Sequence, residues 1–256
     1  MKATTTSPLL NLADVRILAH RGLVSEFVPE NTIKAFTDAI AAGADIIETD
    51  IQVSKDSIAL VFHDADLLRL AGIKKSVSDL TFAELDQIDI GNGKRIPSLE
   101  QVLKAFPKVK FNLDIKSDAA VEATVAVIEK LKAHEQVLIS SFSESRRLRS
   151  LKLFTKPVRT SAGVKKVLKL YFASKFLSLE VFKRTATGSD ALQIPVQRGP
   201  IRLDSPRFVS FANSAGLELH YWTINEPKEM LRLASIGASG IVSDRCDVAK
   251  ATLRQS

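Results

Sequence analysis

The chain has 256 residues, 45% hydrophobic and 25% charged, a length and composition at which one α/β barrel can close. No low-complexity tract and no apolar run of membrane-spanning length is present, which argues against a disordered or membrane-spanning protein. The net charge of +7 favours an anionic partner. Because nucleic-acid-reading signatures are absent and aromatic residues are few, we expect a phosphate-bearing small molecule and no nucleic acid.

The cysteine content and the N-terminal sequence indicate the cellular compartment of the protein. A single cysteine, Cys246, excludes an intrachain disulfide. The opening segment, MKATTTSPLLNLADVR, lacks an apolar stretch long enough for the core of a signal peptide. We therefore expect a cytoplasmic protein.

Strand-like and helix-like segments alternate along the chain. The strand-like runs fall near residues 15–20, 46–53, 109–115, 136–140, 157–160, 191–194, 217–223 and 239–243, with an additional return strand at 58–62. Helical patterns fall near 31–43, 98–106, 118–133, 143–152, 164–178, 204–215, 226–236 and 246–254. Eight such units predict the α/β class and a single (β/α)8 TIM barrel with its active site at the carboxyl ends of the strands. A doubly wound open sheet is the alternative, but no Gly-rich nucleotide loop follows any strand.

Two carboxylates stand two residues apart in the second expected strand. Glu48 and Asp50 therefore lie on one face of it, where they repel each other unless a cation or a proton lies between them. A solvated face of an edge strand is the simpler explanation. The flanking Ile46, Ile47 and Ile51 instead indicate a buried strand, where unpaired charge is costly.

A turn signal at residues 55–57 predicts a hairpin that returns His63 to the side of Thr49 and Asp50. His20 ends the first expected strand. Carboxyl ends of parallel strands share one edge of a sheet, so five side chains are expected to converge there: His20, Arg21, Glu48, Asp50 and His63.

An excursion at about 64–97 follows the hairpin and forms a small insertion. It contains a short helical segment with Thr81 as the expected N-cap and Glu84 three residues later. Beyond it, the strand at 109–116 places Asp114 and Lys116 on one face. An ordinary half-exposed strand is the competing interpretation.

Two later segments also carry candidate function. Residues 163–184 are both basic and apolar, which predicts an amphipathic barrel helix running into a loop. Peripheral contact with an anionic membrane is the alternative. Near the end of the chain, His220 and Trp222 share one face of a strand, with Tyr221 on the opposite face.

An ordered set of short motifs carries a family resemblance: AHRG at 19–22, PENT at 29–32, ETD at 48–50 and HD at 63–64. In this order and spacing they resemble the glycerophosphodiester phosphodiesterases, a branch of the phospholipase-C-like TIM barrels. The resemblance covers nearly the whole chain and is most specific over residues 19–116. It implies hydrolysis of a glycerophosphodiester to sn-glycerol 3-phosphate and an alcohol, and an insertion that covers one side of the pocket mouth.

Roles for individual residues follow from that chemistry. Glu48, Asp50 and Asp114 would hold one divalent cation, Ca²⁺ or Mg²⁺, because the ligands are all oxygen. The family usually has Glu at the place of Asp114, so a bridging water is the alternative to direct ligation there. His20 and His63 would be the general acid and base, in an order left open.

The remaining candidates would bind or orient the substrate. Arg21 and Lys116 would bind phosphoryl oxygens, and Glu30 would orient Arg21 or a ligand. The resemblance assigns Trp222 to the pocket wall, and Asn31 either caps the first helix or bonds within the site. Two alternatives stay open: a lysophospholipid substrate, which a wider apolar pocket mouth would favour, and a barrel that binds without cleaving. The oligomeric state is not predicted.

Overall fold

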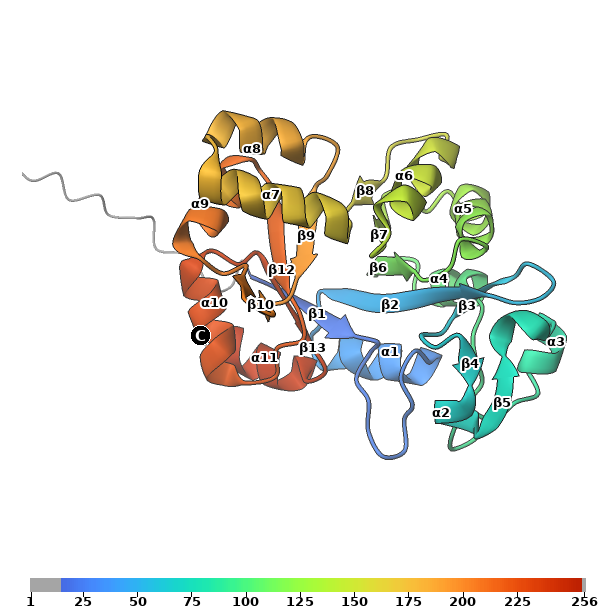
Figure 1. Cartoon of the computed structure of the whole chain (residues 1–256). Coiled ribbons are helices and arrows are strands. Elements are labelled where there is room, and N and C mark those ends of the chain that lie inside the picture. The colour runs from blue at the N-terminus through green and yellow to red at the C-terminus, as the bar shows by residue number, and fades with distance from the viewer. Residues whose placement is uncertain (1–14, 255–256) are drawn as a thin grey trace, which may run out of the picture.

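Eight parallel strands form the central sheet of this computed structural model, which describes residues 15–254. Their spatial order is β8-β7-β6-β2-β1-β13-β12-β9. A single parallel bridge between Ser161 and Ala191 joins the two outermost strands, so the sheet is a nearly closed barrel, as expected (Figure 1). The strands are β1 (Arg16–His20), β2 (Ile46–Val53), β6 (Lys110–Ile115), β7 (Val137–Ser140), β8 (Arg159–Thr160), β9 (Ala191–Ile194), β12 (Glu218–Tyr221) and β13 (Gly240–Ser243).

Helices surround the barrel where the apolar periodicity placed them (Figure 1). Apolar side chains on the outer face of the strands, such as Ile17 and Ile47, pack against these helices in one continuous core. The inner face of the strands carries polar residues and opens at the carboxyl ends. The helices are α1 (Ile33–Ala41), α4 (Leu99–Ala105), α5 (Ala120–Leu131), α6 (Glu144–Leu153), α7 (Val164–Phe176), α8 (Leu179–Ala186), α9 (Pro206–Ser214), α10 (Pro227–Ile236) and α11 (Cys246–Leu253).

The expected hairpin is present: β3 (Ala59–Val61) pairs antiparallel with β2. The insertion that follows has its own small core, which packs Leu67 and Leu85 against Leu60 and Phe62. Thr81 and Glu84 form the expected reciprocal capping box. The insertion lies to one side of the barrel (Figure 1) and comprises β4 (Asp66–Leu67), α2 (Leu68–Ala71), β5 (Ile73–Ser76), the 3₁₀ turn η2 (Val77–Asp79) and α3 (Phe82–Leu85).

Two elements differ from the sequence-based expectation. The segment after α7 is not a loop but the helix α8, which begins after Ser178, whose hydroxyl accepts from Val181 N. A short hairpin of β10 (Gln197–Arg198) and β11 (Ile201–Arg202) was not anticipated, because its strands are too short to show alternation. No helix within residues 15–254 is long and apolar enough to cross a bilayer. Most of the segment assessed for a signal peptide, residues 1–14, lies outside the described part.

Candidate active site

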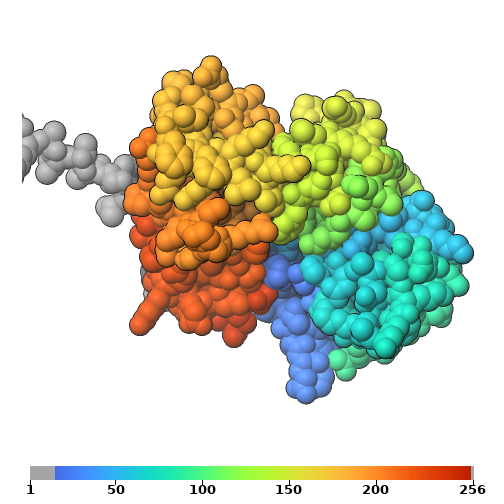
Figure 2. Space-filling model, viewed as in Figure 1, coloured from blue at the N-terminus to red at the C-terminus, as the bar shows by residue number. Residues whose placement is uncertain are grey.

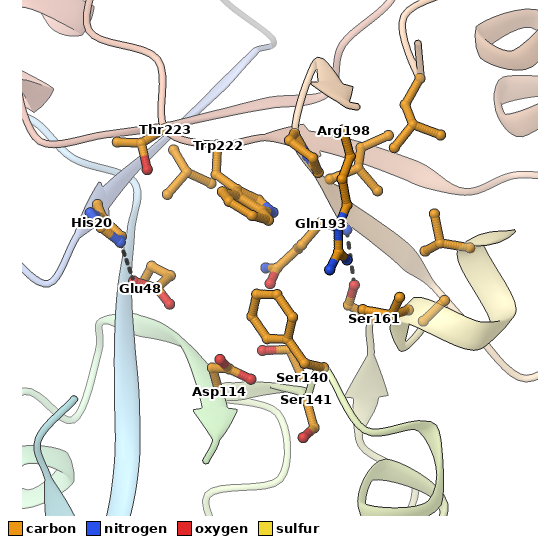
Figure 3. Close-up of a pocket in the computed structure, with 18 of the residues that line it drawn as sticks. His20, Glu48, Asp114, Ser140, Ser141, Ser161, Gln193, Arg198, Trp222 and Thr223 are labelled. Carbon is orange, nitrogen blue, oxygen red and sulfur yellow. Dashed lines mark hydrogen bonds and ion pairs between the residues drawn. The ribbon is translucent and has the colours of Figure 1, made fainter. Parts of the chain in front are cut away.

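A cavity of about 590 Å³ opens at the carboxyl ends of the strands (Figure 3). One part of its wall is ionisable. It contains every predicted catalytic and metal residue and two of the predicted substrate-binding residues: His20, His63, Glu48, Asp50 and Asp114, with Arg21 and Lys116. Another part is apolar and comes mainly from β9, α7, the β10–β11 hairpin and the loops after β7 and β12: Phe142, Val164, Val167, Leu168, Ile194, Ile201, Leu203 and Trp222. The site thus combines a charged region with an apolar flank.

The three carboxylates lie on two neighbouring strands. The pleat of β2 puts Glu48 and Asp50 on the inner face, and the β2–β6 register sets Asp114 beside Asp50. All three residues are buried, at 9%, 1% and 5% exposure respectively. Burial and the neighbouring Asp50 raise the pKa of Glu48 to about 8. The repulsion inferred from the i, i+2 spacing is therefore present.

Lys116 lies between two of these carboxylates. Its Nζ is 2.7 Å from Asp50 Oδ1 and 2.7 Å from Asp114 Oδ2. Arg21 Nε lies 3.0 Å from the other oxygen of Asp50, and Asn31 Nδ2 donates to that oxygen at 3.1 Å. Against the opposing effect of burial, Lys116 and Arg21 hold the pKa of Asp50 below its usual value. Asp114 and Lys116, which the sequence places on one face of the strand, are therefore paired.

Asn31 bonds within the site. Besides donating to Asp50, it accepts a hydrogen bond from Thr49 Oγ1 at 2.7 Å. The cap of α1 is instead Thr32, whose hydroxyl accepts from Ala35 N. Asn31 adopts a left-handed backbone conformation (φ +58°), which asparagine tolerates better than most residues.

His20 is held by the end of the last barrel strand. Its Nδ1 lies 2.6 Å from Asp244 Oδ1, and its Nε2 points toward Glu48, 4.0 Å away (Figure 3). Asn225 Nδ2 donates to the second oxygen of Asp244 at 2.9 Å. Although burial opposes it, the hydrogen bond with Asp244 raises the pKa of His20.

His63 has a similar partner. Its Nδ1 lies 2.6 Å from Asp64 Oδ1, and Arg69 Nε donates to the other oxygen of Asp64 at 2.6 Å. In both histidines the Asp engages Nδ1, which leaves Nε2 as the nitrogen available to a substrate. The hairpin placed His63 here as expected, since Phe62 N donates to Asp50 O.

Glu30 lies beside Arg21 rather than in the cavity wall. Its carboxylate accepts from Arg21 Nη1 at 3.1 Å and from both terminal nitrogens of Arg69. This arrangement favours the orienting role for Glu30 over direct contact with a ligand.

Trp222 lines the cavity, edge-on to Phe142 with ring centroids 5.9 Å apart (Figure 3). His220, on the same face of β12, lies deeper in the barrel, where its Nε2 bonds Glu218 at 3.2 Å. Tyr221 points the other way, and its hydroxyl donates to Leu203 O.

The three carboxylates are also candidate ligands for a divalent cation. Within residues 15–254, no three His, Cys, Asp or Glu side chains are already arranged as a metal site, since Lys116 separates Asp50 from Asp114. Two buried oxygens of these three carboxylates nevertheless lack a hydrogen-bond partner, Glu48 Oε2 and Asp114 Oδ1. An all-oxygen, acidic donor set with unpartnered atoms fits a hard divalent cation.

Comparison with known proteins identifies the family. Residues 20–248 match the Glycerophosphoryl diester phosphodiesterase family. The chain belongs to this family. It is 37% identical over 236 residues to the "Probable glycerophosphodiester phosphodiesterase 2" of Mycobacterium tuberculosis, which covers 92% of this chain and 89% of that protein. The family match and this relative identify the chain as a phosphoric diester hydrolase.

A human protein and a solved bacterial structure are also similar to this chain. The human "Lysophospholipase D GDPD1" is 26% identical, over 89% of this chain and 82% of that protein. The solved structure of an Oleispira antarctica phosphodiesterase in complex with the product sn-glycerol-3-phosphate has a TM-score of 0.76 at 22% identity, covering 94% of this chain and 97% of that one. The barrel fold is thus shared with solved members of the family.

Sequence reasoning missed Asp244 and Asp64, which contact the two predicted histidines, and Asn225, which bonds Asp244. Asp244 carried a usable signal, because it directly follows the last barrel strand on the active edge. Asn225 offered none, since its role depends on the loop that brings it to Asp244.

Proposed function

We propose that this protein hydrolyses glycerophosphodiesters to sn-glycerol 3-phosphate and an alcohol with two histidines and one divalent cation. The main support is the pair of Asp–His contacts at one cavity, which the buried carboxylates also line. The Oleispira antarctica phosphodiesterase, which was solved with sn-glycerol-3-phosphate as its product, supports the same reaction.

The cationic side chains would hold the substrate. Arg21 and Lys116 both line the cavity and present charged nitrogens to the anionic phosphoryl oxygens. Glu30 and Asp50 fix Arg21, so its guanidinium is positioned before the substrate binds.

The histidines would move the protons. One Nε2 takes the proton of the attacking oxygen. If this oxygen belongs to water, the monoester forms directly; if it belongs to the neighbouring hydroxyl of the glycerol, a cyclic phosphate forms first and water then opens it to sn-glycerol 3-phosphate. As the new P–O bond forms and the bond to the alcohol breaks, the other Nε2 donates a proton to the leaving oxygen. Asp244 and Asp64 would keep each Nδ1 protonated and stabilise the imidazolium formed in turn.

Glu48, Asp50 and Asp114 would hold the cation, Ca²⁺ or Mg²⁺. When bound, it would withdraw charge from the phosphate and favour ionisation of the attacking oxygen. Lys116 shares two of these carboxylates and would shift toward the phosphate as the cation binds.

Release of sn-glycerol 3-phosphate from glycerophosphocholine, with and without a chelator, tests the proposal. We expect chelation to abolish activity, and Glu48→Gln or Asp50→Asn to abolish it while the far-UV circular dichroism stays unchanged. Full activity of the wild type in chelator would refute the metal assignment.

A lysophospholipid is the second candidate substrate, and the apolar flank favours it. Val167, Leu168 and Ile201 offer surface that a glycerol and a small head group do not need but an acyl chain would bury. The name of the human relative points to the same class.

The ratio of kcat/KM for 1-acyl lysophosphatidylcholine and glycerophosphocholine separates the two candidates. If the acyl chain lies on the apolar flank, Leu168→Asp should lower the ratio at least about ten-fold, because it removes an apolar contact and adds a charge. An unchanged ratio would exclude this flank as the acyl site.

A further inference from the structure

The helix α7 carries an apolar row from the cavity out to the protein surface. Leu168 lines the cavity, Phe172 follows one turn later and Phe176 one turn after that. Phe172 is 52% exposed, Phe176 is 76% exposed, and their rings stack with centroids 6.3 Å apart. Leu177, 49% exposed, ends the row.

Lysines flank this row. Lys165, Lys169 and Lys175 are exposed on the same helix. The ammonium groups of Lys165 and Lys169 have no hydrogen-bond or ion-pair partner within residues 15–254, while that of Lys175 lies 5.7 Å from the centre of the Tyr171 ring. We refer to Lys165, Lys169, Phe172, Lys175, Phe176 and Leu177 as the α7 surface.

Charge on this part of the chain is strongly one-sided. From Val164 to Ala186 the only acidic residue is Glu180, against the basic residues Lys165, Lys166, Lys169, Lys175, Lys183 and Arg184. A partner for the α7 surface must therefore accept both aromatic rings and several positive charges.

The position of α7 links this surface to the active site. The helix runs across the barrel from β8 toward α9 and packs on α8 and α9 (Figure 1). In the space-filling view it borders the hollow at the centre of the molecule (Figure 2). Phe142, on the rim of the cavity, is a further half-exposed aromatic residue.

We propose that the α7 surface docks on an anionic lipid bilayer and turns the cavity mouth toward it. Phenylalanine rings enter the boundary between head groups and acyl chains, and lysines are attracted to anionic head groups. Neither signal alone gives stable attachment, whereas apolar insertion combined with a basic patch does. An apolar row that continues into the cavity would give a lipid substrate a path that avoids water.

Sedimentation with vesicles tests the proposal without reference to catalysis. The full chain is mixed with vesicles of phosphatidylcholine alone or with about one-third phosphatidylglycerol. We expect binding to the mixed vesicles, weakened by high salt, and little binding to phosphatidylcholine alone. Failure to bind the mixed vesicles would refute the proposal.

Two variants separate the contribution of the aromatic rings to vesicle binding from that of the lysines. Phe172→Ala/Phe176→Ala should lower the partition coefficient at least about ten-fold by removing the inserted rings. Lys165→Glu/Lys169→Glu should lower it by a similar factor, because each lysine near an anionic surface contributes roughly five-fold. The matched control is Lys108→Glu/Lys132→Glu, which changes the charge equally in loops that enter the amino ends of β6 and β7. If the control and the α7 charge variant lose vesicle binding equally, the lysines act only through non-specific attraction of the whole protein to the anionic surface. The assignment of the α7 surface as the docking site would then be wrong.

Activity on a soluble substrate is the control for misfolding of the α7 variants. Hydrolysis of soluble glycerophosphocholine should be unchanged in both α7 variants, because none of the four substituted residues lines the cavity. A loss of this activity would indicate misfolding. In that case Phe172→Leu/Phe176→Leu, which keeps apolar bulk, would have to retain vesicle binding.

Analytical ultracentrifugation tests the rival partner, a second copy of this chain. If the wild type self-associates and Phe172→Ala/Phe176→Ala makes it monomeric without changing vesicle binding, the surface is a self-association interface and the proposal is wrong.

Discussion

His20 and Asp244 are 224 residues apart in the chain, yet Nδ1 of one lies 2.6 Å from Oδ1 of the other. β1 and β13 are neighbours in the barrel, so the last strand ends beside the first. Asn225 donates to the second oxygen of Asp244, which fixes the carboxylate. Asp244 is thus a positioning residue for the proposed catalytic histidine.

The first prediction concerns this contact. Asp244→Asn should lower kcat about ten-fold or more with a smaller effect on KM, because His20 loses its orientation and the charge that stabilises its imidazolium. The pKa of His20 should fall, since Asp244 raises it, and the corresponding limb of the pH–rate profile should move to lower pH. Asp247→Asn, three residues on and paired with Arg245, is the control. An unshifted profile would remove Asp244 from this role.

The second prediction tests which histidine is the general acid and which is the general base. His20→Ala and His63→Ala should each reduce kcat on the order of 10²-fold or more. The variant that lacks the general acid should recover on a substrate with a p-nitrophenol-like leaving group, which needs no protonation. His134→Ala serves as control, because His134 pairs with Glu129 away from the cavity. Equal losses on both substrates for both variants would contradict a separate acid and base.

The third prediction tests the departure from the family at Asp114. Asp114→Glu should retain activity and bind Ca²⁺ or Mg²⁺ at least as well, because its longer side chain reaches further. Asp114→Asn should weaken binding by removing one of three charges. Unchanged affinity of Asp114→Asn in calorimetric titration would leave Glu48 and Asp50 as the only protein ligands.

The fourth prediction concerns Lys116, whose Nζ occupies the space between Asp50 and Asp114. Lys116→Met should bind the divalent cation more tightly, because a competing positive charge is gone, yet raise KM, because the phosphate loses a partner. Calorimetry gives the first quantity and steady-state kinetics the second. Lys110→Met, at the other end of β6, is the control. Weaker metal binding in Lys116→Met would contradict the competition.

The fifth prediction addresses stability at the amino end of the barrel. Glu218 bonds the buried His220 and pairs with Arg16 and Arg159. These partners outweigh burial and lower the pKa of Glu218 to about 2. A carboxyl whose folded pKa is depressed stabilises the fold above its unfolded pKa, near 4.5, and loses that effect as the pH falls toward 2.

Glu218→Gln should therefore lower the free energy of unfolding at pH 7 by about 2 kcal/mol, because it removes a carboxylate whose ionised form the fold stabilises. The difference from wild type should shrink between pH 4.5 and 2. Denaturant titrations at several pH values measure it. Glu100→Gln, at a solvated pair, should change little. A difference independent of pH would exclude this linkage.

Local periodicity was enough to predict much of the molecule. The two-residue repeat of a strand places Glu48 and Asp50 on one face whatever surrounds them, and a three-residue turn returns His63 to their side. Alternation of strands and helices likewise predicts the barrel and the edge on which the ionisable residues meet. The relations within the strand and the hairpin depend on neighbours in sequence, so the sequence determines them by itself.

Contacts between distant segments required the tertiary structure. The pairing of Asp244 with His20 depends on barrel closure, and the position of Lys116 depends on the register of β6 against β2. The left-handed backbone at Asn31 turns its amide toward Asp50 instead of the helix end. Local pattern does not encode register or closure, because both are set by packing summed over the whole core.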